Sequence, residues 1–173
     1  MARNVEIKAR LSPTEFENIQ ATAKKLGRGP ELLMQTDTFF HVHDGRLKLR
    51  EFADGSAELI SYSRSDEAEP RLCRYERFAV DDPAGVKSML EKSTGIQCVV
   101  KKKRSLYLID QTRIHLDEVN DLGLFLEIEV VLRDDQMEEI GQEIMESLLN
   151  QFGIDSSHFE SLAYADMILA KMP

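Results

Sequence analysis

Cysteine and long apolar segments are scarce in this chain. It has two cysteines in 173 residues, Cys73 and Cys98, and neither has a partner at the spacing of a zinc site. No apolar run approaches the length of a membrane-spanning helix, and no apolar secretory segment stands near the start. We therefore expect a cytoplasmic protein with reduced thiols and no membrane partner.

Positive charge is also in short supply, because 22 lysines and arginines face 31 acidic residues and the formal net charge is −9. This balance disfavours long-range attraction to nucleic acid or anionic lipid. The sequence shows no Walker phosphate loop and no serine-histidine-aspartate arrangement. Charged residues nevertheless make up 31% of the chain, which is more than a plain surface needs. Any anion must therefore be bound by a local cluster of cations.

In several short segments, polar and charged residues recur at every second position with mostly apolar residues between them. Lys48 and Arg50, for example, alternate with Leu47 and Leu49. Period two places the charged residues on one face of a strand and the apolar residues on the other. The same pattern occurs at Asn4/Glu6/Lys8, Arg74/Glu76, Lys102/Arg104, Arg113/His115/Asp117 and Glu127/Glu129. A sheet curled with these faces inward encloses cations and carboxylates, as a metal-assisted polyphosphate site requires.

Cap and turn signals divide the chain into strands and helices. A capping box at Ser12 and Glu15 predicts a helix that Gly27 ends, and Asp82-Pro83 predicts a second helix that Gly95 ends. Further helices are expected from about 134 to 152 and from 156 toward 169. Strands are expected near residues 3–11, 36–43, 46–53, 57–65, 71–80, 99–110, 112–119 and 123–132, with a solvated loop up to residue 70.

Tight turns between these strands favour antiparallel pairing, and about eight antiparallel strands can close into a barrel. We therefore predict one α+β domain over residues 1–173, built on a closed or nearly closed eight-stranded antiparallel barrel. Its lumen is polar and charged, and its helices pack outside. Because a strand, a proline-started helix and a glycine stop occur twice at similar spacing, we also expect two similar halves.

Several segments occur in the order that is typical of one protein family. Asn4-Val5-Glu6-Ile7-Lys8 resembles its amino-terminal E-x-E-x-K signature. Further matches in order are 36–40, 48–50, 74–76, 102–107, 115–119 and 123–129. Over nearly its whole length the chain resembles the CYTH superfamily, also called triphosphate tunnel metalloenzymes. The resemblance is strongest to the class IV adenylyl cyclase-like and thiamine triphosphatase-like branch.

This resemblance implies a divalent cofactor, Mg²⁺ or Mn²⁺, and a small triphosphate substrate such as inorganic triphosphate, thiamine triphosphate or ATP. Carboxylate oxygens suit such hard cations, so the expected metal ligands are Glu6, Glu127 and Glu129. Asn4 replaces the first glutamate of the signature, and its amide oxygen is a further candidate ligand. One negative charge is then missing, which lowers the expected metal affinity.

The resemblance also assigns roles to other charged residues. The expected triphosphate-binding residues are Lys8, Lys48, Arg50, Arg64, Arg74, Lys102, Arg104 and Arg113, with Arg64 in place of a lysine usual in the family. Lys8, Asp117 and Glu76 are the expected catalytic residues. Asp117 and Glu76 could each orient a cation, bind the metal or position the attacking water.

Other residues favour simpler interpretations. Solvated surface charge is the ordinary role of such residues, and we expect it for Lys101, Lys103 and Arg46. His115 is expected to form hydrogen bonds in the lumen, with general base as the lesser alternative. Packing or phosphate contact is expected for Tyr62 and Tyr107.

Three functions remain open on the sequence. The leading one is a metal-dependent triphosphatase, in which water attacks the terminal phosphorus of an inorganic or organic triphosphate. The second is a class IV adenylyl cyclase, in which the ribose 3′-hydroxyl of ATP attacks the α-phosphorus and pyrophosphate leaves. Asn4 also keeps open a non-catalytic polyphosphate or nucleotide binder. We expect a monomer or a homodimer.

Overall fold

A computed structural model describes residues 2–65 and 68–173 of the chain. Its strands are β1 (Ala2–Leu11), β2 (Arg28–Phe40), β3 (Arg46–Phe52), β4 (Ala57–Arg64), β5 (Arg71–Ala79), β6 (Ile96–Ile109), β7 (Thr112–Val119) and β8 (Gly123–Val131). Its helices are α1 (Pro13–Leu26), α2 (Pro83–Thr94), α3 (Glu138–Phe152) and α4 (Tyr164–Lys171), with a 3-10 turn, η1 (Ser156–His158), before α4. Residues 66 and 67 of the expected loop lie outside the described residues.

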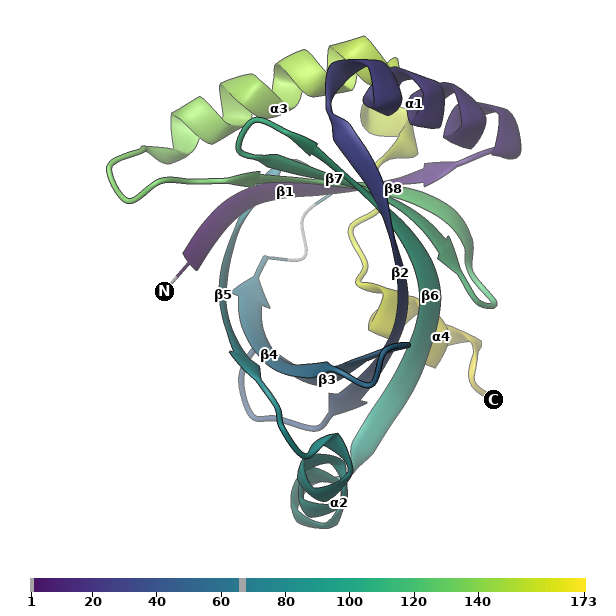
Figure 1. Cartoon of the computed structure of the whole chain (residues 1–173), viewed down its shortest axis with the longest axis vertical. Helices are drawn as coiled ribbons and strands as arrows, with labels where there is room; N and C mark the ends of the chain where they lie inside the picture. The colour runs from purple at the N-terminus through teal and green to yellow at the C-terminus, as the bar shows by residue number, and fades with distance from the viewer. Residues whose placement is uncertain (1, 66–67) are drawn as a thin grey trace.

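The strands form a closed barrel in the order β1-β5-β4-β3-β2-β6-β7-β8, and every neighbouring pair is antiparallel (Figure 1). The predicted α+β fold with an eight-stranded antiparallel barrel and outer helices is therefore confirmed. The strand order places β2 and β3 across the barrel from β1 and β8. Side chains on these four strands can thus face one another through the lumen.

The two halves of the chain repeat the same sequence of elements. β1, α1 and three further strands are followed by β5, α2 and three further strands. Each strand of the first half corresponds to the strand four numbers later, so β1 corresponds to β5 and β4 to β8. The pairing of β1 with β8 therefore corresponds to the pairing of β5 with β4. The expected similarity of the two halves is present in the strand pairing of the barrel.

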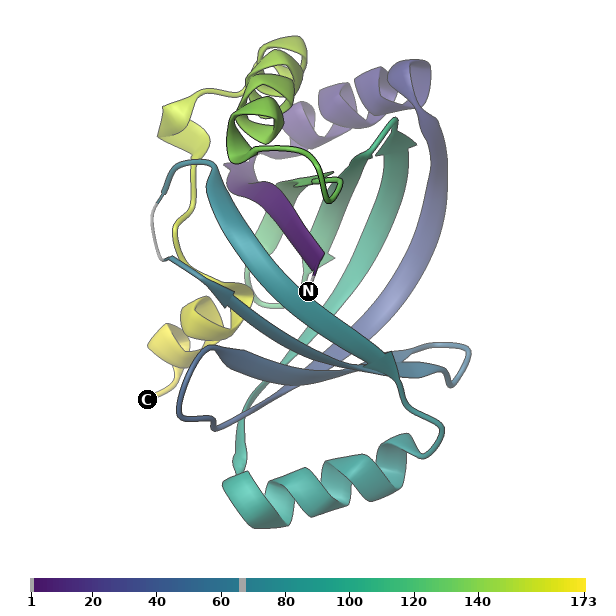
Figure 2. The ribbon, with the colours of Figure 1, turned by 90° about the vertical axis from the view of Figure 1, so that its left-hand side faces the viewer.

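The helices cover the apolar outer faces of the strands. α1 and α3 cross the upper side of the barrel and α2 lies at the opposite end (Figures 1 and 2). Val5, Ile7 and Ile128 are fully buried beneath α1 and α3, together with Met145 of α3. Burying each such side chain contributes about 1.5–3 kcal/mol. These contacts fix which strand face points outward, so the alternate residues must face the lumen.

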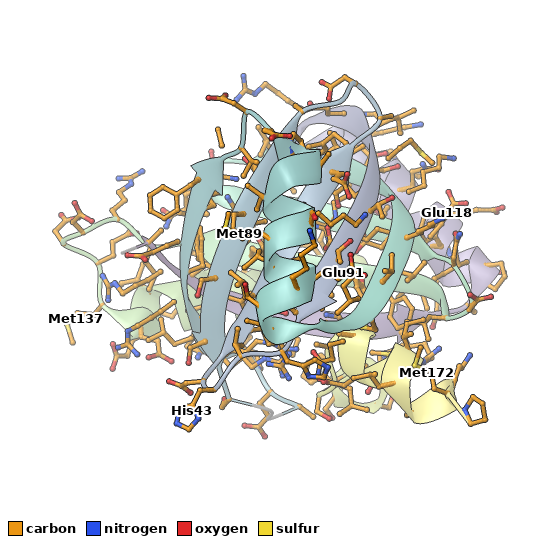
Figure 3. The ribbon with its side chains drawn as sticks, turned by 90° about the horizontal axis from the view of Figure 1, so that it is seen from below. His43, Met89, Glu91, Glu118, Met137 and Met172 are labelled. Atoms are coloured by element: carbon orange, nitrogen blue, oxygen red, sulfur yellow. The ribbon has the colours of Figure 1, made fainter. Side chains whose placement is uncertain are left out.

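α2 crosses the lower side of the barrel, with Met89 and Glu91 labelled on it in Figure 3. It packs on β2 and β3, and Phe40, Leu49 and Ala57 of β2, β3 and β4 form a separate small core there. None of the described helices is long and apolar enough to cross a membrane.

The expected bounds differ most from the structure in three places. β2 begins at Arg28 and not near residue 36, because a register shift against β6 accommodates Pro30, which lacks an N–H donor. α3 begins at Glu138, after a turn. The expected fourth helix is interrupted, since Phe159 pairs with Ala9 of β1 and α4 begins only at Tyr164.

Candidate active site

A cavity of about 400 Å³ lies inside the barrel, lined by residues of all eight strands and of the segment that starts α4. Most of the alternating residues singled out in the sequence line it. These are Asn4, Glu6, Lys8, Lys48, Arg50, Arg64, Lys102, Arg104, Arg113, His115, Glu127 and Glu129. The polar faces of the strands therefore converge on one enclosed space.

Asp37 of β2 is the centre of a buried cationic cluster. Its carboxylate accepts hydrogen bonds from Lys48 at 3.0 Å, from Arg50 at 2.7 and 2.8 Å and from Lys102 at 2.9 Å. Burial alone would raise the pKa of Asp37, but Arg50, Lys102 and Lys48 hold it well below its usual range. Burial lowers the pKa of Lys102 to about 7, and the nearby Arg50, Arg104 and Lys48 add to this. Three cations around one carboxylate leave this wall with surplus positive charge.

Arg104 of β6 is held by two carboxylates. Its guanidinium donates to both oxygens of Asp117 at 2.7 Å and to Glu127 at 2.7 Å. Asp117 is fully buried and also accepts a hydrogen bond from the Tyr164 hydroxyl at 2.8 Å. Asp117 thus orients Arg104, which is one of the roles that the sequence left open for it. Lys8 lies 4.1 Å from the centre of the Tyr164 ring and 3.7 Å from Glu127.

Carboxylates gather on the wall formed by β1 and β8. Glu6 lies opposite Glu129 in the pairing of these strands. Burial, followed by repulsion from Glu127 and Glu129, raises the pKa of Glu6 to about 7, although Arg64 and Lys8 oppose the shift. Burying a further negative charge at this wall therefore costs free energy unless a cation lies beside it.

His115 of β7 faces the same carboxylates. Its Nδ1 lies 3.9 Å from Glu127 and 3.8 Å from Glu129. Burial, together with the charge of Arg104, lowers the pKa of His115 to about 4. The imidazole is therefore neutral at pH 7, and these contacts are not ion pairs. The ligand atoms of His115, Glu127 and Glu129 all lie within 4.8 Å of one another, so they could hold a metal ion.

Three predicted site residues do not line the cavity: Asp117, which is buried beside Arg104, and Arg74 and Glu76. The side chains of Arg74 and Glu76 are exposed, and the prediction that they line the lumen is wrong. The register of β5 with β1 explains the error, because Cys73 pairs with the inward Asn4 and Arg71 pairs with the inward Glu6. Directly paired residues share a face of the sheet. Arg71, which the sequence did not indicate, lies 3.7 Å from Glu6 and is almost fully buried.

The remaining predicted residues fall on both sides of the strands. Lys101 and Lys103 are exposed, whereas Arg46 is only partly exposed and pairs with Asp166 of α4 at 2.8 Å. Tyr62 lines the cavity and Tyr107 packs in the core under α1. The two cysteines are free and buried, Cys73 against the cavity, and burial raises the pKa of Cys98 to about 11.

The donor set of the acidic wall fits a divalent cation. Asn4 is 2% exposed, and its side-chain oxygen has no hydrogen-bond partner among the described residues. An unsatisfied buried oxygen next to repelling carboxylates is the environment that a hard cation satisfies. Asn4, Glu6, Glu127 and Glu129 are the residues that could hold it.

Two further site residues, besides Arg71, were missed in the sequence for different reasons. Asp37 stands two residues after the inward Gln35 and two before the inward Phe39, so the alternation of β2 could have indicated it. Tyr164 reaches the cavity from the start of α4, after Phe159 pairs with Ala9 of β1 and the N–H of Glu160 donates to the carbonyl of Lys8. Strand periodicity carries no information about such a residue.

The CYTH domain model matches residues 2–164 of the sequence. The chain belongs to the CYTH domain family. Among solved structures, the CYTH chain is similar to the PH1012 protein of Pyrococcus horikoshii OT3, with a TM-score of 0.84 and 24% identity over 94% of this chain and 98% of that one. A search of curated proteins found no match.

Two further structures share the fold. A candidate adenylate cyclase from Vibrio parahaemolyticus has a TM-score of 0.76 and 23% identity, covering 95% of this chain and 97% of that one. A candidate adenylyl cyclase from Hippeastrum, with a dominant triphosphatase activity, has a TM-score of 0.67 and 16% identity, covering 98% and 95%. These likenesses establish the barrel architecture of the CYTH domain and not its reaction.

Proposed function

We propose that this CYTH domain is a metal-dependent triphosphatase that hydrolyses the terminal phosphate of a small inorganic or organic triphosphate. The observation that carries the proposal is the division of the cavity into two facing walls. Lys48, Arg50 and Lys102 gather on the β2, β3 and β6 side, and Glu6, Glu127 and Glu129 gather on the β1 and β8 side. A triphosphate would neutralise the cationic wall, and a divalent cation would neutralise the acidic wall.

The cationic wall would bind the phosphate chain. Arg50 offers a planar fork suited to phosphate oxygens, and Lys48 and Lys102 offer point charges. These three groups converge on Asp37 within 3.0 Å, so their positions are set before substrate binds. Incoming phosphate oxygens compete with Asp37 for the same donors, and preorganised donors stabilise charge that develops in the transition state.

On the other wall, Asn4, Glu6, Glu127 and Glu129 would hold Mg²⁺ or Mn²⁺. When bound, the ion would neutralise negative charge on the phosphoryl oxygens and on the leaving group. Arg104 on β6, fixed by Asp117, and Lys8 on β1, placed over the Tyr164 ring, both contact Glu127 and would contact the reacting phosphate. The Hippeastrum protein, with its dominant triphosphatase activity, supports hydrolysis over cyclisation for a barrel of this kind.

Product analysis with purified protein and Mg²⁺ or Mn²⁺ tests the proposal. We expect phosphate release from inorganic triphosphate or from an organic triphosphate. Cyclic AMP and pyrophosphate from ATP would instead establish the class IV adenylyl cyclase reaction. Binding of triphosphate without any product would contradict both enzymatic functions and indicate a polyphosphate-binding protein.

Site variants connect the activity to the cavity. Glu129→Gln or Glu127→Gln should lower metal-dependent turnover at least about 100-fold, because the carboxylate charge that holds the ion is lost. Lys103→Ala is the control, since Lys103 lies on the outer face and pairs with Glu118 at 3.2 Å. Equal losses in Lys102→Ala and Lys103→Ala would place the reaction outside the cavity.

A further inference from the structure

One buried nitrogen in the cavity lacks a hydrogen-bond partner. Nδ1 of His115 has no partner among the described residues, and the side chain is 4% exposed. An imidazole that lines a polar cavity with an unsatisfied ring nitrogen is unusual, because leaving a buried polar atom unpaired costs about 1–3 kcal/mol. In the neutral tautomer that carries its proton on Nε2, Nδ1 presents a lone pair to the cavity.

The atoms nearest to this lone pair are carboxylate oxygens. Oε1 of Glu129 lies 3.8 Å from Nδ1, and Oε2 of Glu127 lies 3.9 Å from it. Bonds from a metal ion to nitrogen and oxygen ligands are about 2.0–2.2 Å long, so two ligands of one ion stand at most about 4.4 Å apart. The three ligand atoms, all within 4.8 Å of one another, need to move only slightly to share an ion.

Two arginines hold the carboxylates beside this imidazole. Arg113 contacts Oε2 of Glu129, whereas Oε1 of Glu129 faces His115. Arg104 contacts Oε2 of Glu127, the oxygen that also lies 3.9 Å from the imidazole nitrogen, and is itself held by Asp117. Arg113 therefore holds Glu129 by one oxygen and leaves the other toward the imidazole, and Arg104 fixes Glu127 with Oε2 toward the imidazole, in the manner of residues that orient metal ligands.

We propose that His115, Glu127 and Glu129 form a metal site with one nitrogen and two oxygen ligands, which prefers transition-metal dications such as Co²⁺ and Zn²⁺ to Mg²⁺. Imidazole is a favourable ligand for later first-row dications, whereas Mg²⁺ takes oxygen ligands and retains its water. Glu127 and Glu129 also hold the ion in the proposed function. The inference therefore rests on that part of the proposed function that places a divalent cation at the acidic wall. The imidazole adds a metal preference that carboxylates alone do not provide.

Metal binding to the full chain, without any triphosphate, tests the site. Isothermal titration with Co²⁺ and with Mg²⁺ is compared between the native protein and His115→Gln. We expect His115→Gln to lower Co²⁺ affinity at least about tenfold and Mg²⁺ affinity less than about threefold, with a shift of the Co²⁺ visible absorption bands. His43→Gln is the matched control, because His43 is exposed in the loop between β2 and β3 and does not line the cavity (Figure 3).

Unchanged Co²⁺ affinity in His115→Gln, or equal losses for Co²⁺ and Mg²⁺, would overturn the inference. If His115→Gln fails to fold, the proton NMR spectrum of the native protein with Co²⁺ decides, since a ligating imidazole must show contact-shifted ring signals. Absence of such signals would also overturn it. Co²⁺ preference that depends on His115 in a protein without triphosphatase activity would support the site and contradict the proposed function. Phosphate release by a protein whose Co²⁺ binding does not depend on His115 would support the proposed function and contradict the site.

Discussion

At the scale of single residues, the acidic wall is governed by repulsion. The pKa of Glu6 is raised to about 7 because the carboxyl group is buried and two further glutamates face it. Asn4 stands next to this group on the same face of β1 and contributes an oxygen without a charge. The neutral amide of Asn4 therefore adds no further repulsion at this wall, but it also attracts a cation less strongly than a carboxylate would.

Asn4→Glu should strengthen metal binding. An ionised carboxylate attracts a hard cation more than an amide oxygen does, so we expect about a tenfold lower dissociation constant for Mg²⁺ or Mn²⁺. The same change should lower the melting temperature of the metal-free protein, because it adds charge to the wall that already raises the pKa of Glu6. Calorimetric metal titration and thermal unfolding with and without metal measure both effects.

Gln35→Glu is the control for this prediction. Gln35 is buried, lines the cavity on β2 and pairs with Lys102 of β6, so the same amide-to-acid change adds charge at the opposite wall. It should not tighten metal binding. Equal tightening in both variants would show a general effect of charge, and unchanged affinity in Asn4→Glu would place Asn4 outside the coordination sphere.

At the scale of elements, the position of α3 depends on a close approach to the barrel. A Cβ atom added to Gly141 would lie 2.6 Å from a methyl group of Val5 and 2.9 Å from one of Leu132. Both distances are shorter than carbon atoms tolerate, and the neighbours belong to a packed core. Only glycine lets α3 lie this close to β1.

Gly141→Ala should destabilise the protein although alanine is the better helix former. The gain in helix propensity is about 1 kcal/mol, whereas overpacking a core costs about 1–3 kcal/mol. We expect a net loss of up to about 2 kcal/mol in the free energy of unfolding, measured by urea denaturation. Glu146→Ala, at an exposed position of the same helix, should stay within about 0.5 kcal/mol of the native protein. A stabilised Gly141→Ala variant would contradict the close packing.

The start of α1 is joined to η1 by a titratable pair. His158 contacts Glu15 at 2.9 Å, and Glu15 also accepts hydrogen bonds from the backbone and hydroxyl of Ser12. The bonds from Ser12 and His158 lower the pKa of Glu15 to about 2, and the bond with Glu15 raises the pKa of His158. Glu15 is therefore ionised throughout the range in which His158 titrates.

This pair predicts a pH-dependent stability. Because the folded pKa of His158 exceeds its unfolded value, the stabilisation is fully present below pH 6.5 and is lost as pH rises through the folded pKa. The melting temperature of the native protein should exceed that of His158→Gln more at pH 5.5 than at pH 8.5. In a Glu15→Gln background, His158→Gln should lose most of this pH dependence. An equal difference at both pH values would contradict the coupling.

At the scale of the whole molecule, closure of the barrel gives the cavity two walls. Positive side chains from β3 and β6 meet at Asp37 on one wall, and acidic side chains from β1 and β8 meet on the opposite wall. Arg71 and Asp37 join the interior charges, whereas Arg74 and Glu76 lie in solvent. A ligand that binds only the folded barrel must then raise its stability by mass action.

Binding of a non-hydrolysable imido analogue of triphosphate with Mg²⁺ should raise the melting temperature by about 5–10 °C at 100 times its dissociation constant. Lys102→Met should lose most of this shift, because Lys102 is buried in the cavity, whereas Lys103→Met should retain it, because Lys103 is exposed. Differential scanning fluorimetry measures the shifts. Equal shifts in the two variants would show that the analogue binds outside the lumen.

The sequence by itself determined the alternation, the barrel class and most of the inward charged residues. Period two is a local property of a strand, so Lys48 and Arg50, or Glu127 and Glu129, are assigned to one face without knowledge of any partner. The capping residues Ser12 and Asp82 likewise act within a single turn, and both predicted helix starts agree with the structure.

Only the tertiary structure decided which face of each strand is the inner one and which distant residues join the site. On β5 both faces carry polar residues, and pairing with β1 turned Arg71 and Cys73 inward and left Arg74 and Glu76 in solvent. Tyr164 enters the cavity after Phe159 and Glu160 have paired with Ala9 and Lys8 of β1. Register and chain path depend on contacts between residues far apart in sequence, and no local period encodes them.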